Sequence, residues 1–279
     1  MLTKHVLRHV CAAASMLLAG HAMATPTVVT TSDLQGWVLG DGGNGTSPAT
    51  ISGDQAYQGN GSIQFTISGT GQQPLAFYSF GTAVRVGDLL NGGVSLGFSY
   101  MAPAGAPDPT IRLMLSGLTN STQVGRDDGS LGFYGANTGD GNWHTSTVDM
   151  TSGDFFFRVG GKGQESLGCG SGDYALSFDD RRQSLANWAS TCTGAGTGTV
   201  DLDDAMIYGI EVDYGSFPGA SGVMSSYVDG VNFSVGRNIG DFNFEASATS
   251  VPEPASLALV GLALGGAAFA RRRVAAKRG

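Results

Sequence analysis

The sequence predicts an all-β protein whose central segment folds as a jelly-roll-like β-sandwich with one short helix. Three observations support this: runs of alternating apolar and polar residues, polar Gly- and Asp-rich turns between them, and 226 residues between two terminal segments of different composition. Alternation with a period of two turns one face of a strand inward, and long strands with wide loops are typical of two-sheet sandwiches. A domain of this length buries about 70% of the surface that its unfolded chain exposes.

Five segments carry the alternating pattern and are bounded by turn residues such as those at 40–45. In each of them we expect every second side chain to face the core. The segments are 63–67, 94–100, 111–115, 206–214 and 231–235.

Asp229 lies just before the last alternating segment, at a position that the alternation turns toward the core. Asp229 shares this parity with Tyr227, Val231 and Phe233, which predicts that it points inward. A buried carboxylate needs a partner, here Ca²⁺, an arginine or a bulge that turns it out. The segment 227–233 resembles the last strand of many carbohydrate-binding jelly rolls, a likeness at the level of fold.

Two segments depart from the strand pattern. Residues 179–188 begin with two aspartates and place Leu185 and Trp188 three residues apart, which predicts a short helix packed on the sheet and capped by an early Asp. Residues 238–250 are mostly small and polar, and we expect them to form a linker. The predicted sandwich therefore covers residues 25–237.

The first 24 residues have the features of a secretory signal peptide. Lys4 and Arg8 give a positive start, residues 10–19 are apolar, and Ala22 and Ala24 form an A-x-A cleavage site. We expect cleavage before Thr25 and an exported mature protein.

The last 29 residues, 251–279, combine three parts in order. Pro252, Glu253 and Pro254 are followed by an uncharged apolar run at 255–270, and Arg271, Arg272 and Arg273 close it. A spanning helix needs about 20 apolar residues, so this run is at or just below the short limit, and the arginines stay on the cytoplasmic side. The prolines keep the preceding backbone extended and accessible. These features fit either an uncut membrane anchor or a cleaved sorting signal.

This order of motif, apolar helix and basic stop resembles the PEP-CTERM sorting signal of Gram-negative bacteria. The resemblance covers about a tenth of the chain and implies recognition by a membrane exosortase that cuts near Pro252, Glu253 and Pro254. It also implies transient residence in the inner membrane, delivery to the cell surface or extracellular matrix, and a link to exopolysaccharide. It implies little about the upstream domain, because many unrelated domains carry this signal.

The charge of the mature domain restricts its partners. Residues 25–250 hold 8 Lys and Arg against 22 Asp and Glu, a net charge of −14. This argues against a nucleic-acid partner, because binding to phosphates needs a basic surface. Divalent cations or a neutral polysaccharide are compatible with this charge, and solubility alone also explains it.

Cys169 and Cys192 are the two cysteines that remain after export. Disulfides persist outside the cytoplasm, and an even pair without metal-ligand spacing predicts one bridge. Such a bridge closes a loop of 24 residues and contributes roughly 3–4 kcal/mol. Two free thiols are the alternative.

The best catalytic candidates are Glu211 and Asp213, which lie two apart on a predicted strand and so share a face. Retaining glycosidases use two carboxyls about 5–5.5 Å apart. Laminarinase-like sandwiches carry a third acid where this chain has Ser216, so the acid/base is missing. We therefore expect a solvent-facing acidic pair and no enzyme, with a glycan-active enzyme as the less favoured alternative.

Metal and sugar ligands have separate candidates. Asp127 and Asp128 in an acidic turn, and the inward Asp229, supply the oxygen ligands that structural Ca²⁺ prefers. Trp37 and Trp143 lie beside polar or Gly-rich loops, where exposed rings can stack on sugars; core packing is the alternative.

The sequence thus predicts a non-enzymatic exported surface or matrix protein associated with exopolysaccharide, with a carbohydrate-binding module as the alternative.

Overall fold

The computed structural model describes eleven segments of the chain. The predicted signal peptide with Ala22 and Ala24, the cysteine pair, Asp127, Asp128 and the C-terminal tail lie outside them. The chain divides into two compact units, residues 1–246 and 247–279, and every strand below belongs to the first. The described segments are 25–43, 45–69, 71–90, 93–106, 108–118, 129–134, 139–149, 155–159, 184–187, 202–215 and 222–247.

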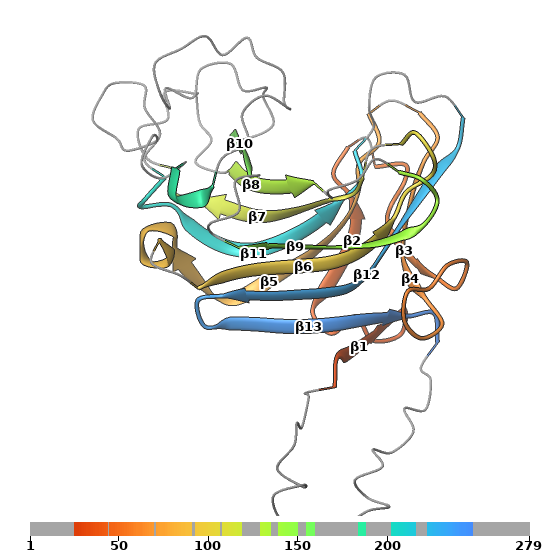
Figure 1. Cartoon of the computed structure of the whole chain (residues 1–279), viewed down its shortest axis with the longest axis horizontal. Helices are drawn as coiled ribbons and strands as arrows, with labels where there is room; N and C mark the ends of the chain where they lie inside the picture. Colours follow the sequence, from red (N-terminus) through yellow and green to blue (C-terminus); the bar gives the residue numbers. More distant parts are fainter. Residues whose placement is uncertain are drawn as a thin grey trace, which may run out of the picture. The chain divides into compact units, whose positions relative to one another are not determined.

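Sheet A is organised around the long strand β12, which has neighbours along both edges (Figure 1). Along one edge, the first part of β12 pairs with β4 and the last part with β13. Along the other edge β12 pairs with β6, which in turn pairs with β9. Only β1 runs parallel to its neighbour among the described pairings, beside β13. The strands are β1 (Thr27–Thr30), β3 (Thr50–Ser52), β4 (Ser62–Ile67), β6 (Val94–Met101), β9 (Trp143–Asp149), β12 (Met224–Val235) and β13 (Asn238–Glu245).

Sheet B is antiparallel throughout its described pairings, in the order β10-β8-β7-β11-β5-β2. A 3₁₀ turn, η1 (Val86–Leu89), follows β5. The two-sheet sandwich predicted from the sequence is therefore confirmed. The strands are β2 (Trp37–Asp41), β5 (Pro74–Arg85), β7 (Thr110–Ser116), β8 (Gly129–Tyr134), β10 (Phe156–Val159) and β11 (Met206–Asp213).

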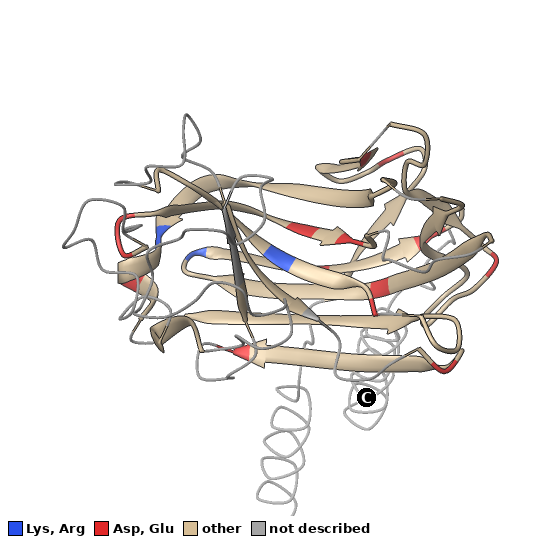
Figure 2. Cartoon of the chain, turned by 90° about the horizontal axis from the view of Figure 1, so that it is seen from above, with Lys and Arg blue, Asp and Glu red and all other residues tan. Residues whose placement is uncertain are grey.

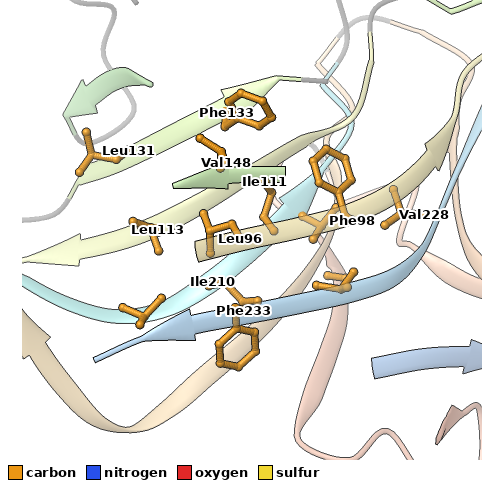
Figure 3. Close-up of a cluster of buried hydrophobic side chains, with 14 of the residues drawn as sticks. Leu96, Phe98, Ile111, Leu113, Leu131, Phe133, Val148, Ile210, Val228 and Phe233 are labelled. Carbon is orange, nitrogen blue, oxygen red and sulfur yellow. The ribbon is translucent and has the colours of Figure 1, made fainter. Parts of the chain in front are cut away.

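The core lies between the two sheets, where inward side chains from both interdigitate (Figure 3). Burying a Val, Leu, Ile or Phe side chain contributes about 1.5–3 kcal/mol, so this layer supplies most of the driving force for the fold. The central residues are Leu96, Phe98, Val228 and Phe233 from sheet A, and Ile111, Leu113, Leu131, Phe133 and Ile210 from sheet B.

Bulges interrupt two of the predicted alternations. On β11 the register shifts between Ile207 and Gly209, so Ile207 is buried and the inward parity predicted for Tyr208 is wrong at that end. On β12 it shifts between Asp229 and Asn232. A bulge inserts one extra residue and reverses which side chains face the core.

The predicted linker at 238–250 is wrong in its first part, because residues 238–245 form β13. Phe242 and Phe244 of this strand are buried, while Ile239 and Asp241 face outward. The third inward position of β13 is Gly240, opposite Phe233. Because glycine has no side chain, only two apolar residues alternate in this strand, which is too few to predict it. Pairing with β1 and β12 supplies the stability that local sequence does not.

The predicted helix at 179–188 is described over 184–187. Residues 185–187 are helical, and Leu185 is fully buried in the core, as expected. The cap is Ser184 instead of an Asp: its Oγ accepts a 3.2 Å hydrogen bond from the Asn187 N–H. Trp188 lies outside the described residues.

In the part of the chain that the structure describes, no helix has the length and apolar character needed to cross a bilayer. The apolar run predicted as the helix of the C-terminal tail, residues 255–270, is not in that part.

Candidate functional sites

Glu211 and Asp213 lie together on the face of sheet B that is turned away from sheet A, as their spacing predicts. Glu211 pairs across the sheet with Arg112 and Asp213 with Thr110. The Arg112 guanidinium lies 2.7 Å from Asp213 Oδ2 and 3.9 Å from Glu211 Oε1. Gln73 Nε2 also donates to Asp213 Oδ2, at 2.7 Å. The acidic pair is therefore part of an ion network that the sequence did not predict.

Burial defines what this network can do. Asp213 is 0% exposed, and the Arg112 guanidinium lies 5.8 Å from the centre of the Phe156 ring. A buried carboxylate requires such compensation, which Arg112 supplies. A retaining glycosidase needs a free nucleophile and an acid facing the substrate. Here the carboxylates face a shared arginine, which fits a structural ion network.

Trp37 is a core residue, and the prediction of an exposed ring at this position is wrong. It is only 2% exposed and pairs across the sheet with Tyr78, whose ring centre lies 5.4 Å away. Its ring also meets Phe242 at 5.5 Å and Phe244 at 5.3 Å, both from sheet A. Trp37 therefore joins the two sheets.

Trp143, unlike Trp37, is partly exposed to solvent. It begins β9 on the outer face of sheet A, partly exposed, and its ring centre is 5.5 Å from that of Tyr57, with the rings inclined at 47°. Tyr57 is 42% exposed. Its hydroxyl accepts a 3.2 Å hydrogen bond from Thr145 Oγ1, which also lies 3.0 Å from Ser99 Oγ. We call Tyr57, Trp143, Thr145 and Ser99 the aromatic platform.

The loop at 53–61 that carries Tyr57 is attached to the end of the sandwich by two buried carboxylates. Asp229 Oδ2 accepts a 3.0 Å hydrogen bond from the Gln58 N–H, and Glu245 Oε2 accepts one of 2.5 Å from the Asn60 N–H. Asp229 is 0% exposed and Glu245 is buried too. Two strands distant in sequence thus fix the position of the loop.

Asp229 is buried, but the prediction from parity that it points into the core is wrong. Strand register places it with Ser99 on the outer face of sheet A, under the loop at 53–61, because the bulge on β12 separates it from Val231. Its partners are backbone N–H groups. Oδ1 accepts hydrogen bonds from Gly230, at 2.8 Å, and from Phe244, at 3.0 Å. Burial raises the pKa of Asp229 to about 6, against the lowering effect of the N–H donors and with a further raising effect of Glu245. The described contacts include no arginine at this carboxylate.

Metal ligation at the predicted sites stays a prediction. Within the described segments, no group of three or more His, Cys, Asp or Glu side chains lies close enough to share an ion. Asp127 and Asp128 lie outside these segments.

In the described segments acidic residues outnumber Lys and Arg (Figure 2). Near the platform, His144 Nε2 lies 2.9 Å from Asp140 Oδ1. The hydrogen bond from His144, followed by those from Asn142, lowers the pKa of Asp140 to about 2. Asp140 is therefore ionised at neutral pH.

Sequence reasoning missed two residues of these sites. Arg112 is the one charged side chain in its alternating strand, which was a usable signal for a partner on the same face. Tyr57 is an isolated aromatic residue in a polar, Gly-containing loop, and such rings have few ways to be buried.

Residues 250–273 match the model of the PEP-CTERM protein-sorting motif. The chain is a PEP-CTERM domain-containing protein. The match includes the Pro252–Glu253–Pro254 motif, the apolar run and the three arginines. The motif indicates an exported protein that an exosortase processes and that is sorted through the membrane to the cell surface.

Comparison with solved structures found several that are similar to this chain at low identity. A family 11 carbohydrate-binding module from Clostridium thermocellum, in complex with a β-1,3-1,4-mixed-linked tetrasaccharide, shares 15% identity over 74% of this chain and 92% of its own, with a TM-score of 0.38. An endo-β-1,4-glucuronan lyase from Trichoderma reesei shares 9% identity over 73% of this chain and 97% of its own length, with a TM-score of 0.40.

A third structure comes from a study of the specificity of carbohydrate-binding modules of the β-sandwich superfamily. It shares 14% identity over 72% of this chain, which spans 57% of that structure's length, with a TM-score of 0.34. A search of the curated proteins gave no match. At these identities the likeness concerns the fold alone, and binding modules and an enzyme both occur among the similar structures.

Proposed function

We propose that this protein is a non-enzymatic component of the cell surface or extracellular matrix, and that its β-sandwich associates with exopolysaccharide. The observation that carries the proposal is the PEP-CTERM motif at 250–273, behind a sandwich that ends at about residue 246. In this proposal the apolar run at 255–270 holds the chain in the inner membrane until the exosortase cuts near Glu253. The sandwich is then the whole of the delivered product.

The ion network on sheet B supports a non-enzymatic role. Asp213 is buried and bound by both Arg112 and Gln73, so attack on a glycosidic carbon would first require breaking an ion pair of 2.7 Å. Separating such a buried pair is unfavourable because each charge loses its compensation. Glu211 and Asp213 then act to hold β7 against β11, instead of acting as nucleophile and acid.

The charge of the domain supports association with an uncharged polymer. The mature segment has a net charge of −14, which repels polyanions such as nucleic acids and uronic acid polymers. Sugar contacts that depend on hydroxyl groups and aromatic rings need no opposite charge. A carbohydrate-binding module is therefore the molecular role that we favour within this proposal.

Processing can be tested by intact-mass analysis of the protein exported by its native host. We expect the mature form to lack residues 271–279, and the triple change of Pro252, Glu253 and Pro254 to Ala to leave the chain uncut in the membrane fraction. Ser256→Ala is the matched control and should be processed normally. A full-length C-terminus on exported wild-type protein would favour an uncut anchor instead.

Association and catalysis need a second measurement. We expect exported protein to co-sediment with the exopolysaccharide of the same host and to release no reducing ends from it. Reducing ends that appear with wild type and disappear with Glu211→Gln would establish a glycan-active enzyme. Protein that stays in the supernatant at every polysaccharide concentration would remove the proposed association.

A further inference from the structure

We propose that the aromatic platform on the outer face of sheet A binds the uncharged pyranose rings of a polysaccharide. Tyr57 and Trp143 supply the stacking surface, and the hydroxyl group of Thr145 supplies hydrogen bonds beside it. This inference rests on the proposed function, because it names the site and the class of sugar for that association.

The two rings form a surface that folding alone does not explain. Four large apolar side chains are exposed in the described segments, and Tyr57 is the aromatic one among them. Trp143 is partly exposed beside it. Leaving apolar ring surface in water is unfavourable, so an exposed aromatic pair points to a ligand that covers it. The apolar CH face of a pyranose is a flat surface of suitable size for an indole or phenol ring.

Hydrogen-bonding groups lie directly beside the rings. Thr145 is exposed and already links the Tyr57 hydroxyl, at 3.2 Å, to Ser99 Oγ, at 3.0 Å. Such a chain of hydroxyl groups both donates and accepts, as sugar hydroxyls do. The platform therefore offers an apolar surface for the ring of a sugar and polar atoms for its edge.

The platform continues as a row across the outer face of sheet A. Strand register places five side chains in line over five strands, each of them partly or fully exposed. Gln64 Nε2 donates to the Tyr227 hydroxyl at 3.3 Å within this row. Neighbouring strands lie about 4.8 Å apart, so the row extends over roughly 19 Å, enough for several linked sugars. The row consists of Trp143, Met101, Tyr227, Gln64 and Thr50.

The charges around the row select against acidic sugars. Asp54 accepts a 3.3 Å hydrogen bond from Gln64 in the row, and Asp140 lies three residues before Trp143. Among the arginines in the described segments, Arg237 lies in the turn after β12, whose last residue Val235 is eight residues, or roughly 26 Å, along the strand from Tyr227. In the described segments no Lys or Arg contacts Asp54 or Asp140, and negative charge repels uronic acids, so the ligand of this proposal is uncharged.

Two buried carboxylates hold the platform in place. Asp229 and Glu245 bind the backbone N–H groups on either side of Gly59, directly after Tyr57. Gly59 has a φ of +70°, and a Cβ there would overlap the Glu245 carboxylate. Gly230 lies under the ring, since a Cβ on it would be 3.9 Å from Tyr57 Cδ1. Asp229 and Glu245 are therefore positioning residues for the site.

The test uses the full chain in detergent micelles and a panel of hexasaccharides, measured by isothermal titration calorimetry. The panel holds uncharged hexamers of glucose, galactose, mannose and N-acetylglucosamine, with uronic acid hexamers beside them. We expect at least one uncharged hexamer to bind, and Trp143→Ala and Tyr57→Ala each to weaken it about tenfold or more. Ile239→Ala, which removes a 77% exposed side chain from the same face, should leave the affinity unchanged.

Each other outcome overturns the inference. Binding that survives both aromatic changes moves the site elsewhere, and preference for a uronic acid hexamer contradicts the choice of an uncharged sugar. If no uncharged hexamer binds while the protein still co-sediments with its host's exopolysaccharide, this inference fails and the proposed function stands. Concentration-dependent dimerisation that Trp143→Ala abolishes would make the platform a contact between copies of the chain.

The positioning role has its own readout. Glu245→Ala should weaken binding of the uncharged hexamer several-fold and shift the NMR amide signal of Asn60, because it removes the acceptor of that N–H. Glu245→Gln keeps an oxygen acceptor and should restore most of the affinity. A loss of stability with unchanged affinity in Glu245→Ala would show that the carboxylate is structural only.

Discussion

The carboxylate of Asp229 accepts a 3.0 Å hydrogen bond from the backbone N–H of Gln58, which lies 171 residues earlier in the chain. This contact joins the central strand of sheet A to the loop that presents Tyr57. The carboxylate is fully buried, so its ionisation is coupled to the stability of the fold.

Stability should fall as the pH rises through the range in which Asp229 titrates. Burial raises its folded pKa to about 6 from an ordinary value of 3.8, so the folded state binds the proton more tightly than the unfolded state. Stability is then highest below pH 3.8, decreases between pH 3.8 and 6, and loses roughly 3 kcal/mol in total. Urea unfolding between pH 4 and 7 measures this slope.

Asp229→Asn should remove that slope, because the side chain no longer titrates. Asp241→Asn, on the exposed face of the neighbouring strand, is the control and should retain the wild-type slope. An identical slope in wild type and Asp229→Asn would assign the pH dependence to another group.

Gly59→Ala should destabilise the domain by more than the cost of its backbone angle. A residue with a side chain in the left-handed region costs about 1–2 kcal/mol, and here the methyl group would also displace Glu245 from the Asn60 N–H. Losing a hydrogen bond to a buried charged group adds about 1–3 kcal/mol. Gly105→Ala is the control, with a φ of +77° and open space around the Cβ, and should show the first cost only. Equal losses in chemical denaturation would contradict the predicted contact.

Arg112→Met should destabilise the domain by roughly 3–5 kcal/mol, because Asp213 would remain buried without its cation. Adding Asp213→Asn should recover part of this loss, since the uncompensated charge is removed. Thermal and urea unfolding of the single and double variants give the coupling between the two residues. A loss below 1 kcal/mol in Arg112→Met would show that the ion pair does not compensate Asp213.

Trp37→Ala should cost about 3–5 kcal/mol, because it leaves a cavity among Tyr78, Phe242 and Phe244. Val38→Ala, the adjacent outward side chain, should change stability by no more than about 0.5 kcal/mol. Calorimetry of both variants gives the comparison. Little loss in Trp37→Ala would mean that this ring is not the junction between the sheets.

Sequence reasoning reached the fold class and three of the strands with their faces, because alternation is a local property. The segments at 63–67, 94–100 and 111–115 lie in β4, β6 and β7 with the expected side chains inward, and 231–235 forms the last part of β12 in the same way. The sorting motif was also readable, because it is recognised as a linear sequence.

Tertiary structure decided what alternation does not encode. The bulges on β11 and β12 turn Ile207 and Val228 inward in place of Tyr208 and Tyr227, and β13 forms because β12 and β1 complete its hydrogen bonds. A strand with two inward aromatic residues gains its stability from these partners and not from its own sequence.

The sequence by itself determined that this chain is exported, carries a sorting motif and folds as a β-sandwich, since composition, linear motifs and local periodicity are properties of adjacent residues. Only the tertiary structure decided that Trp37 is buried while Trp143 meets Tyr57 at the surface, and that Arg112 compensates Asp213. The physical reason is that burial and charge pairing depend on which distant strands become neighbours, and strand pairing brings together residues that the sequence separates.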